Sequence, residues 1–414
     1  MNIHTPHKTN YKNSPLGLIP EDWEVKKFKD ILEEGKLGGN YENSEANDGV
    51  PVMKMGNLGR GVININKVQY LPENDKYSED DILNKGDLLF NTRNTLELVG
   101  KVSIWRNELP FSLYNSNLMR IKFKEKYIGS NDFMNLAFNS HYLLSQLKGI
   151  ATGTTSVAAI YGKDLNKIKF LLPLIPEQTA IANCLSTWDK AIAAQTKLIE
   201  QKELRNKSLA QQLLTGKVRL KGFEKNKWTE LKADKIFRNN TDKTHNGELE
   251  ILSASQERGI VPRSSNNIDI KYDENSLGSY KKVEVGDYVI SLRSFQGGIE
   301  YSEYEGIVSP AYTILKEIIP ISKVFYKVYF KTETFINRLN TIIYGIRDGK
   351  QISFKDFATL KLPYPSIEEQ TAIAMVLQCS DKELQLLKNK LQFFKDQKKG
   401  LMQLLLTGAK RLNY

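Results

Sequence analysis

Apolar residues recur along two long stretches of the chain with the spacing of a helical seam. In the second stretch, with the polar Lys398 as the one interruption, they fall at Leu384, Leu387, Leu391, Phe394, Leu401 and Leu405. Steps that alternate three and four place one apolar stripe along a helix, as at the a and d positions of a coiled coil. Proline at or near each start, and Gly216 and Gly408 after the ends, are typical helix boundaries. The pattern predicts two long helices, and 38 residues from Glu177 to Leu214 would span about 57 Å.

The first stretch follows the same periodicity less regularly. Its apolar positions are Leu185, Trp188, Ile192, Ile199, Leu209 and Leu213. Three polar residues, Gln195, Lys202 and Asn206, interrupt this seam and leave its register of pairing open. A single surface helix with a leucine stripe is the alternative interpretation. The matched second copy favours two helices that pair as an antiparallel coiled coil, because a two-fold repeat places equivalent helices in opposite directions.

The two stretches belong to an internal repeat. When the chain is shifted by 192 positions, residues 175–220 overlay residues 367–412 without a gap, and 19 of 46 positions are identical. The identities cluster at the two ends, in "EQTAIA" at the start and in "LLTG" followed by Arg-Leu at the finish. Such a repeat describes the architecture of the whole chain.

A globular segment precedes each predicted helix. "KGDLLFNTR" (85–93) and "VGDYVISLR" (285–293) are both a Gly-Asp turn that opens an apolar strand ending on arginine. Further strands and a helix-like stretch follow in each segment. We therefore expect a mixed α/β fold with an internal pseudo-two-fold repeat, in which two globular domains are separated by the paired helices. The expected parts are a polar tail (1–13), domain 1 (14–174), a helical region (175–221), domain 2 (222–366) and a second helical region (367–414).

The charge of the chain indicates a polyanionic partner. The formal net charge is +11 and the pI is near 9.2. No apolar run approaches the roughly 18 residues of a membrane span, and the N-terminus lacks the apolar stretch of a signal peptide, so we expect a cytoplasmic protein. Two cysteines, Cys184 and Cys379, indicate no disulfide framework, and the four histidines show no metal-ligand spacing.

Motifs for catalysis are missing from the sequence. "GIRDGKQ" (345–351) has three residues between its glycines and Gln after Lys, whereas a phosphate-binding loop needs four residues and then Ser or Thr. There is also no Asp/Asn-Pro-Pro-Tyr/Phe tetrapeptide of the kind that amino-methyltransferases use to hold a flipped base. The sequence predicts a protein that recognises a polyanionic partner, without an active site, a bound cofactor or a metal of its own.

These features together resemble the specificity (S) subunit of Type I restriction–modification enzymes. The resemblance rests on "PEQTAIA" and "EEQTAIA", on the two "LLTG" ends, and on the stretches 85–105 and 286–312, which are similar to that family's target-recognition domains. It implies that each target-recognition domain reads one half of a split double-stranded DNA site, while the paired helices set the spacer. It also implies that two methyltransferase (M) subunits dock on the chain and that two restriction (R) motor-nuclease subunits can join. S-adenosylmethionine and ATP would then bind the partner subunits only.

Two other classes of function stay open at this point. One is a standalone coiled-coil DNA-binding regulator, which would have no methyltransferase partner. The other is a methyltransferase or nuclease with a diverged site, which would methylate or cleave DNA as the purified chain.

Candidate DNA-binding residues follow from the matched strands and the loops beside them. Arg93 and Arg293 occupy matched positions, so they are expected to hold phosphate or the fold, whereas base readers should lie among divergent polar residues. Because the domains differ in sequence, the recognised site should be asymmetric. The expected base readers are Lys54, Asn57, Arg60, Asn91, Asn94 and Asn117 in domain 1, and Ser255, Gln256, Arg258, Ser294, Gln296 and Tyr312 in domain 2. Further candidates in the loops before each helix are Thr154, Thr155, Arg347 and Lys350.

Overall fold

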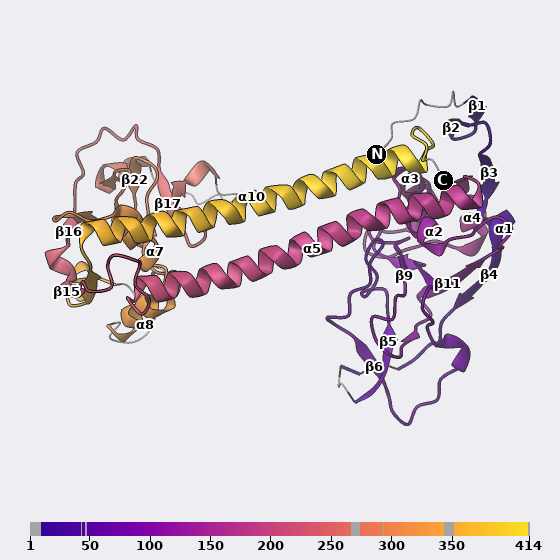
Figure 1. Cartoon of the computed structure of the whole chain (residues 1–414), viewed down its shortest axis with the longest axis horizontal. Helices are drawn as coiled ribbons and strands as arrows, with labels where there is room; N and C mark the ends of the chain where they lie inside the picture. Colours follow the sequence, from indigo (N-terminus) through magenta and orange to yellow (C-terminus); the bar gives the residue numbers. More distant parts are fainter. Residues whose placement is uncertain are drawn as a thin grey trace. The chain divides into compact units, whose positions relative to one another are not determined.

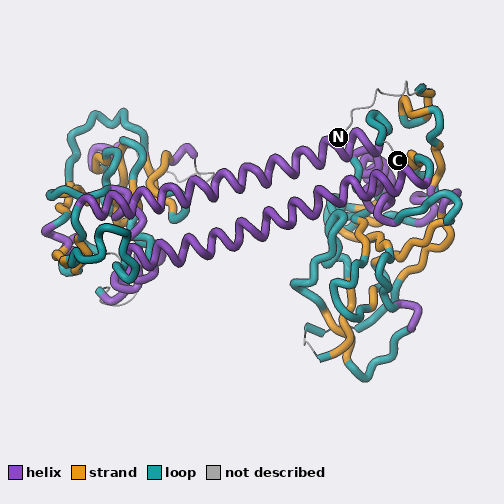
Figure 2. The backbone as a smooth tube through the Cα atoms, viewed as in Figure 1, coloured by secondary structure: helices purple, strands orange, loops and turns teal. Residues whose placement is uncertain are grey.

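The computed structural model describes residues 10–42, 44–45, 48–265, 274–292, 294–342 and 352–412. Contacts within the chain divide it into two compact units. Unit 1 comprises the chain up to Thr196 together with the segment from Lys390 onward, and unit 2 comprises Lys197–Asn389. Figure 2 shows that both units contain helices, strands and many loops, so the expected mixed α/β fold is confirmed.

Two long helices are shared between the units. Helix α5 (Ile175–Leu214) and helix α10 (Ile367–Leu406) have 40 residues each, and Figure 1 shows each of them as one continuous helix. After each helix the chain turns at a glycine with positive φ, 69° at Gly216 and 71° at Gly408. A left-handed residue at this position is a common way to end a helix, and glycine adopts it without strain. The predicted long helices and their glycine ends are confirmed.

The halves of the two helices that belong to unit 1 pack against each other. The rings of Trp188 and Phe394 meet edge to face with their centroids 5.9 Å apart. Lys398 Nζ lies 2.5 Å from an oxygen of Asp189. Glu177, which precedes these contacts on α5, hydrogen-bonds Arg411, which lies beyond them after α10. Residue numbers thus rise along α5 as they fall along α10, and the pairing is antiparallel.

The halves that belong to unit 2 pair in the same sense, through polar contacts. Lys202 Nζ lies 2.5 Å from Glu383 Oε1, and Asn206 Nδ2 donates to the Ser380 carbonyl at 3.2 Å. Two of the polar residues that left the register open therefore bridge the helices, and polar groups at seam positions can fix the register of a coiled coil. Gln195, the third, is buried in unit 1.

The globular part of unit 1 consists of short strands and helices. In chain order the strands are β1 (Tyr11–Ser14), β2 (Gly17–Pro20), β3 (Glu24–Lys27), β4 (Leu32–Leu37), β5 (Gly49–Met53), β6 (Gln69–Pro72), β7 (Leu88–Asn91), β8 (Arg93–Asn94), β9 (Val102–Ile104), β10 (Leu113–Tyr114), β11 (Leu118–Phe123), β12 (Thr152–Gly153), β13 (Ala158–Ala159) and β14 (Lys169–Leu172). The helices are α1 (Phe28–Ile31), α2 (Asn131–Phe138), α3 (His141–Ile150) and α4 (Gly162–Leu165), with a 3-10 turn at Glu79–Asp81.

The globular part of unit 2 has a corresponding set of elements. The strands are β15 (Thr229–Lys232), β16 (Phe237–Asn240), β17 (Leu252–Ser255), β18 (Gly259–Pro262), β19 (Lys281–Val283), β20 (Tyr288–Ile290), β21 (Glu300–Tyr301), β22 (Gly306–Val308), β23 (Thr313–Glu317) and β24 (Lys361–Tyr364). The helices are α6 (Ser294–Gly297), α7 (Lys323–Tyr329), α8 (Glu333–Thr341) and α9 (Phe354–Ala358), with 3-10 turns at Ala233–Lys235, Arg263–Ser265 and Glu274–Ser279.

A four-stranded antiparallel sheet recurs at the centre of each domain. Its strand order is β4-β11-β7-β9 in unit 1 and β16-β23-β20-β21 in unit 2. On one face of the unit 1 sheet Leu88 and Phe90 join a large apolar core with Phe138 of α2. In unit 2, Tyr288 and Ile290 occupy the corresponding places beside Phe330. The two domains therefore share one scaffold under different side chains.

The predicted Gly-Asp turn opens the central strand in both sheets. Gly86 and Gly286 have φ values of 98° and 101°. Asp87 Oδ2 accepts the backbone N–H of Asn84 at 2.9 Å, and Asp287 Oδ2 accepts that of Glu284 at the same distance. The motif recurs because the aspartate closes a tight turn by accepting the backbone N–H three residues before it. The residue just before the aspartate has a positive φ, which glycine adopts without strain.

The repeated ends of the long helices contact one another within each unit. Glu177, at the start of α5, is fully buried and accepts two hydrogen bonds from Arg411, which follows α10. In unit 2 the fully buried Glu369 accepts two from Arg219, at 2.8 and 2.7 Å. We call these two ion pairs the helix-end clasps. They give a physical reason for the clustered identities, since the carboxylate of one copy must match the arginine of the other.

The neighbouring glutamines of "EQTAIA" also have matched structural roles. Gln178 Nε2 donates to the Pro173 carbonyl at 3.0 Å, and Gln370 Nε2 donates to the Pro365 carbonyl at 2.9 Å. Both glutamines are fully buried. Each therefore holds the segment that leads from a globular domain into its long helix.

Candidate nucleic-acid interface

Four of the expected DNA-binding residues of domain 1 are brought together by a small sheet of order β12-β13-β8. Arg93 and Asn94 pair with Ala159 and Ala158 of β13. The loop between β12 and β13 carries Thr154 and Thr155, and the Thr155 carbonyl accepts the N–H of Leu96 at 3.1 Å. Arg93, Thr154 and Thr155 are exposed, so this edge presents a cation and hydroxyl groups to solvent.

The hairpin after β5 carries two expected readers whose side chains are engaged within the domain. Asn57 is buried, and its Nδ2 donates to the Asn64 and Lys67 carbonyls at 3.0 Å while its Oδ1 accepts the Lys54 N–H. Lys54 Nζ lies 2.6 Å from Gln69 Oε1. These contacts favour a supporting role for Asn57, because reading a base would require breaking them.

Two other expected readers have polar atoms without a partner. Arg60 is half-buried, its Nη2 donates to the Glu97 carbonyl at 3.2 Å, and its Nη1 is buried without a hydrogen bond. Asn91 is fully buried at the end of β7, and its Nδ2 has no partner. Asn117 is half-buried, and its carbonyl accepts the N–H and the hydroxyl of Thr92.

In domain 2 the β17–β18 hairpin brings three expected residues to one turn. Ser255 Oγ accepts the N–H of Arg258 at 3.3 Å, and the turn closes at Gly259, whose φ is 74°. Gln256 and Arg258 are exposed there. Domain 1 also has an Arg-Gly turn, Arg60-Gly61, where the φ of Gly61 is 79°.

The remaining expected residues of domain 2 differ in accessibility. Ser294 is buried, and its hydroxyl accepts the Ser291 N–H at 2.9 Å, whereas Gln296 is exposed. Tyr312 is half-buried, and its carbonyl accepts a hydrogen bond from Lys281 Nζ at 2.6 Å. Outside the described residues lie Arg293, Arg347 and Lys350. DNA contact by any of the residues named from the sequence stays a prediction.

An ion pair with a buried carboxylate, which sequence reasoning missed, links the segments of domain 2 that carry the expected residues Gln256 and Gln296. Lys331 Nζ lies 2.6 Å from Glu300 Oε1 and 2.9 Å from the Gly297 carbonyl, and it reaches the Gln256 carbonyl at 3.4 Å. Burial raises the pKa of Glu300, although its contact with Lys331 opposes this. Nothing in the sequence marks the pair, since its members are 31 residues apart on different elements.

The turn that opens β20 contains a second buried acid. Asp287 is almost completely buried. Burial raises its pKa to about 6, against the hydrogen bond from the backbone of Glu284. Its charged form is therefore disfavoured in the folded domain.

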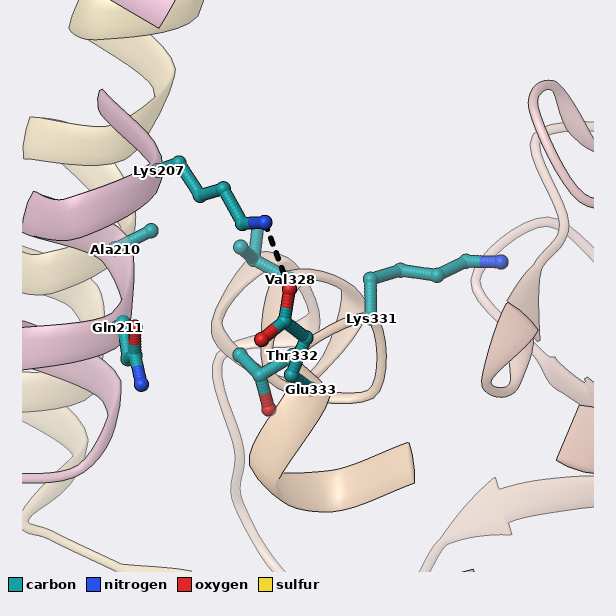
Figure 3. A pocket seen from close by; sticks show the side chains of 7 residues that line it. All are labelled: Lys207, Ala210, Gln211, Val328, Lys331, Thr332 and Glu333. Carbon is teal, nitrogen blue, oxygen red and sulfur yellow. Dashed lines mark hydrogen bonds and ion pairs between the residues drawn. The ribbon is translucent and has the colours of Figure 1, made fainter. Parts of the chain in front are cut away.

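Unit 2 also contains a pocket of about 290 Å³ beside α5. It is lined by Lys207, Ala210, Gln211, Val328, Lys331, Thr332 and Glu333 (Figure 3). Figure 3 shows the Lys207 ammonium directed to the Glu333 carboxylate, 2.7 Å away, while Lys331 extends away from α5. The lining brings together no nucleophile with a general base, and we assign no chemistry to the pocket.

In the part of the chain that the structure describes, His, Cys, Asp and Glu nowhere gather in a group of three or more that could hold a metal ion. In the same residues, every helix is too short or too polar to cross a membrane.

Comparison with known proteins finds one family in sequence and in fold. Residues 20–204 match the family model described as the Type I restriction modification DNA specificity domain. The type I restriction enzyme MjaX specificity subunit of Methanocaldococcus jannaschii is 28% identical and covers 97% of each chain. The MjaVIII specificity subunit of the same organism is 34% identical over 52% of this chain and 51% of its own. The crystal structure of the S subunit of a Type-I restriction-modification system from M. genitalium superposes with a TM-score of 0.51 at 16% identity, over 98% of both chains.

Proposed function

This chain belongs to the specificity subunits of type I restriction–modification systems, and we propose that each of its two domains binds one half of a split DNA site. The observation that carries the proposal is the repeated four-stranded sheet with different polar side chains beside it. Both domains carry an Arg-Gly turn, Arg60-Gly61 and Arg258-Gly259, yet the residues around the two turns differ. Two scaffolds with unlike surfaces would read two unlike half-sites, so the whole site would be asymmetric.

We propose that helices α5 and α10 hold the spacing between the half-sites and dock two methyltransferase subunits. The polar cross-helix contacts of Lys202 and Asn206 support a defined register, because a shifted register would leave these groups unpaired. Fixed register and fixed helix length give a fixed spacer. A standalone DNA-binding regulator is not favoured, since the similarity to specificity subunits extends over 97% of the chain.

The chain itself supplies recognition in this proposal, and its partners supply the chemistry. S-adenosylmethionine would bind the methyltransferase subunits, and ATP would bind motor-nuclease subunits where these join the complex. The net charge of +11 supports DNA as the ligand of this chain, because cationic surfaces attract the phosphate backbone.

Sequencing of methylated bases in cellular DNA, with and without this gene, tests the proposal. Cells that carry the gene and its methyltransferase partner should methylate a split, asymmetric motif that is absent when the gene is deleted. The matched control replaces residues 222–366 with the corresponding segment of a relative, and it should change one half-site and preserve the other. Methylation that does not depend on the gene, or a change in both halves, would contradict the proposal.

A further inference from the structure

Backbone hydrogen bonds join the segments of domain 1 that carry Asn91, Lys101 and Arg60, at the end of β7. The N–H of Asn91 donates to the Lys101 carbonyl at 2.8 Å, and the N–H of Gly100 donates to the Asn91 carbonyl at 2.9 Å. Asn91 and Lys101 are therefore opposed across two antiparallel strands. Side chains of an opposed pair lie on the same face of a sheet.

The turn that carries Arg60 covers this same face. Side chains alternate along a strand, so Ser103 lies on the face of Lys101. The Ser103 hydroxyl donates to the Gly59 and Val62 carbonyls at 3.0 and 2.9 Å, and the N–H of Gly61 donates to the Val102 carbonyl. Hydrogen bonds thus hold the turn of Arg60 against the segment that carries Lys101 and Ser103.

Arg60, Asn91 and Lys101 each have a side-chain nitrogen atom without a hydrogen-bond acceptor in the described part of the chain. Arg60 Nη1 and Asn91 Nδ2 are buried without a hydrogen-bond partner, and within the described residues Lys101 makes no side-chain hydrogen bond or ion pair. Burial lowers the pKa of Arg60, although the charge of Glu97 opposes this. Burial and then the charge of Arg60 lower the pKa of Lys101. The two neighbouring cations repel each other in the free domain, and a bound anion would relieve this repulsion.

Another arginine of the same domain shows what a structural role requires. Arg120 is buried, lies 3.4 Å from Asp87 Oδ2, and donates to the Asp80 and Ile82 carbonyls at 2.8 and 3.1 Å. These three acceptors all belong to the same domain. Arg60 has one such contact, so its guanidinium keeps donors for a ligand.

Domain 2 has no place for the same cluster. Its strand pair β20–β21 opposes Val289 to Glu300, and continuing that ladder places Gly298 opposite Ser291, where domain 1 has Lys101 opposite Asn91. A Cβ atom at Gly298 would lie 2.0 Å from the Phe330 carbonyl oxygen. No side chain is accommodated there, and the donor cluster belongs to domain 1 alone.

We infer that Arg60 and Lys101, whose side chains are half-buried, form a binding site for one backbone phosphate of DNA, present in domain 1 and absent from domain 2. The inference rests on the proposed function, because it assumes that DNA is the ligand. A phosphate matches a site made only of donors, with a guanidinium for directional bonds and an ammonium as a point charge. A backbone contact positions the duplex without reading its sequence. Base reading is then left to other residues of domain 1, such as Asn94.

The test uses the complete complex of this chain with its methyltransferase subunits and measures the Kd for a duplex with the recognised site across a series of KCl concentrations. The variants are Arg60→Gln, Lys101→Gln and the double variant, and Lys85→Gln, an exposed lysine of the same domain, is the control. At low salt the double variant should bind about tenfold more weakly. Its slope of log affinity against log salt should fall by about 1, the value for one lost phosphate contact. The decreases in this slope for the two single variants should together stay below 2, because both side chains hold the same phosphate.

Two further measurements separate a phosphate site from other roles. The methylated sequence should be the same in parent and variants, and the double variant should unfold at the same or a slightly higher temperature than the parent, because it relieves charge repulsion. An altered sequence would identify Arg60 as a base reader, and a lowered unfolding temperature would identify a structural pair. An unchanged salt slope with binding of inorganic phosphate would identify a site for a free anion. Each of these results overturns the inference, whereas a parent complex without specific DNA binding refutes the proposed function itself.

Discussion

The helix-end clasp of unit 2 permits a quantitative test of why the repeat is most similar at its ends. Glu369 is fully buried, and both its oxygens accept hydrogen bonds from Arg219. The Arg219 guanidinium also lies over the Trp228 ring, 5.4 Å from its centroid. Replacing Arg219 with Gln leaves a carboxylate buried without its cation, and loss of one partner of a buried pair costs about 3–5 kcal/mol.

Removing both charges should cost much less than removing one. In the double variant Arg219→Gln with Glu369→Gln, no charge remains buried, and replacing both partners of a buried pair is often close to neutral. We therefore expect a coupling free energy of about 2 kcal/mol or more between the two positions in a double-mutant cycle. This expectation separates neutralisation of the carboxylate from any packing that Arg219 provides.

Hydrogen exchange of the backbone amides from Ile373 to Leu377 measures the effect where it arises. A loss of about 3 kcal/mol in the free energy of local opening corresponds to exchange that is roughly 100-fold faster or more. The control is Lys221→Gln, which removes an exposed cation close to Arg219 in sequence and should leave the exchange unchanged. If Arg219→Gln and the double variant accelerate exchange equally, the buried carboxylate does not require its arginine, and our explanation of the repeated ends is wrong.

Three other expectations follow from the described contacts and from the sequence. The stability contributed by protonated Asp287 is complete below its unfolded pKa of 3.8 and is lost as pH rises through about 6. The free energy of unfolding of Asp287→Asn should therefore rise by about 2–3 kcal/mol relative to that of the parent between pH 4 and pH 8. Urea unfolding at both pH values checks this, and a difference that does not vary with pH contradicts it. Insertion of four residues after Glu200 adds about 6 Å of helix, a length comparable to two base pairs. Mapping of methylated sites should then show the two half-sites one or two base pairs further apart. Methylation at the original spacing would show that the length of the helix does not set the spacer. Calorimetry on the purified chain should detect neither S-adenosylmethionine nor nucleoside triphosphate binding, because the motifs that hold them are missing from the sequence, and stoichiometric binding of either would refute this.

Periodicity and repetition in the sequence determined the long helices and the duplicated order of the chain. Steps of three and four from Leu384 onward are a local signal, because residues on one face of a helix are close in sequence. The Gly-Asp turns were equally predictable, since Asp87 and Asp287 bind the backbone three residues before them. The structure has these features where the sequence placed them.

Only the tertiary structure decided which polar groups are occupied within a domain. Asn57 and Arg60 are three residues apart in one polar hairpin and were expected to act alike. The amide of Asn57 is engaged by its own hairpin, whereas Arg60 keeps a buried nitrogen without a partner beside Lys101, which no sequence pattern had marked. The same holds for Glu177 and Arg411, which are 234 positions apart and meet only in the folded unit. Local periodicity reports which face of an element is apolar, but the partner of a polar side chain depends on which distant segments the fold brings beside it.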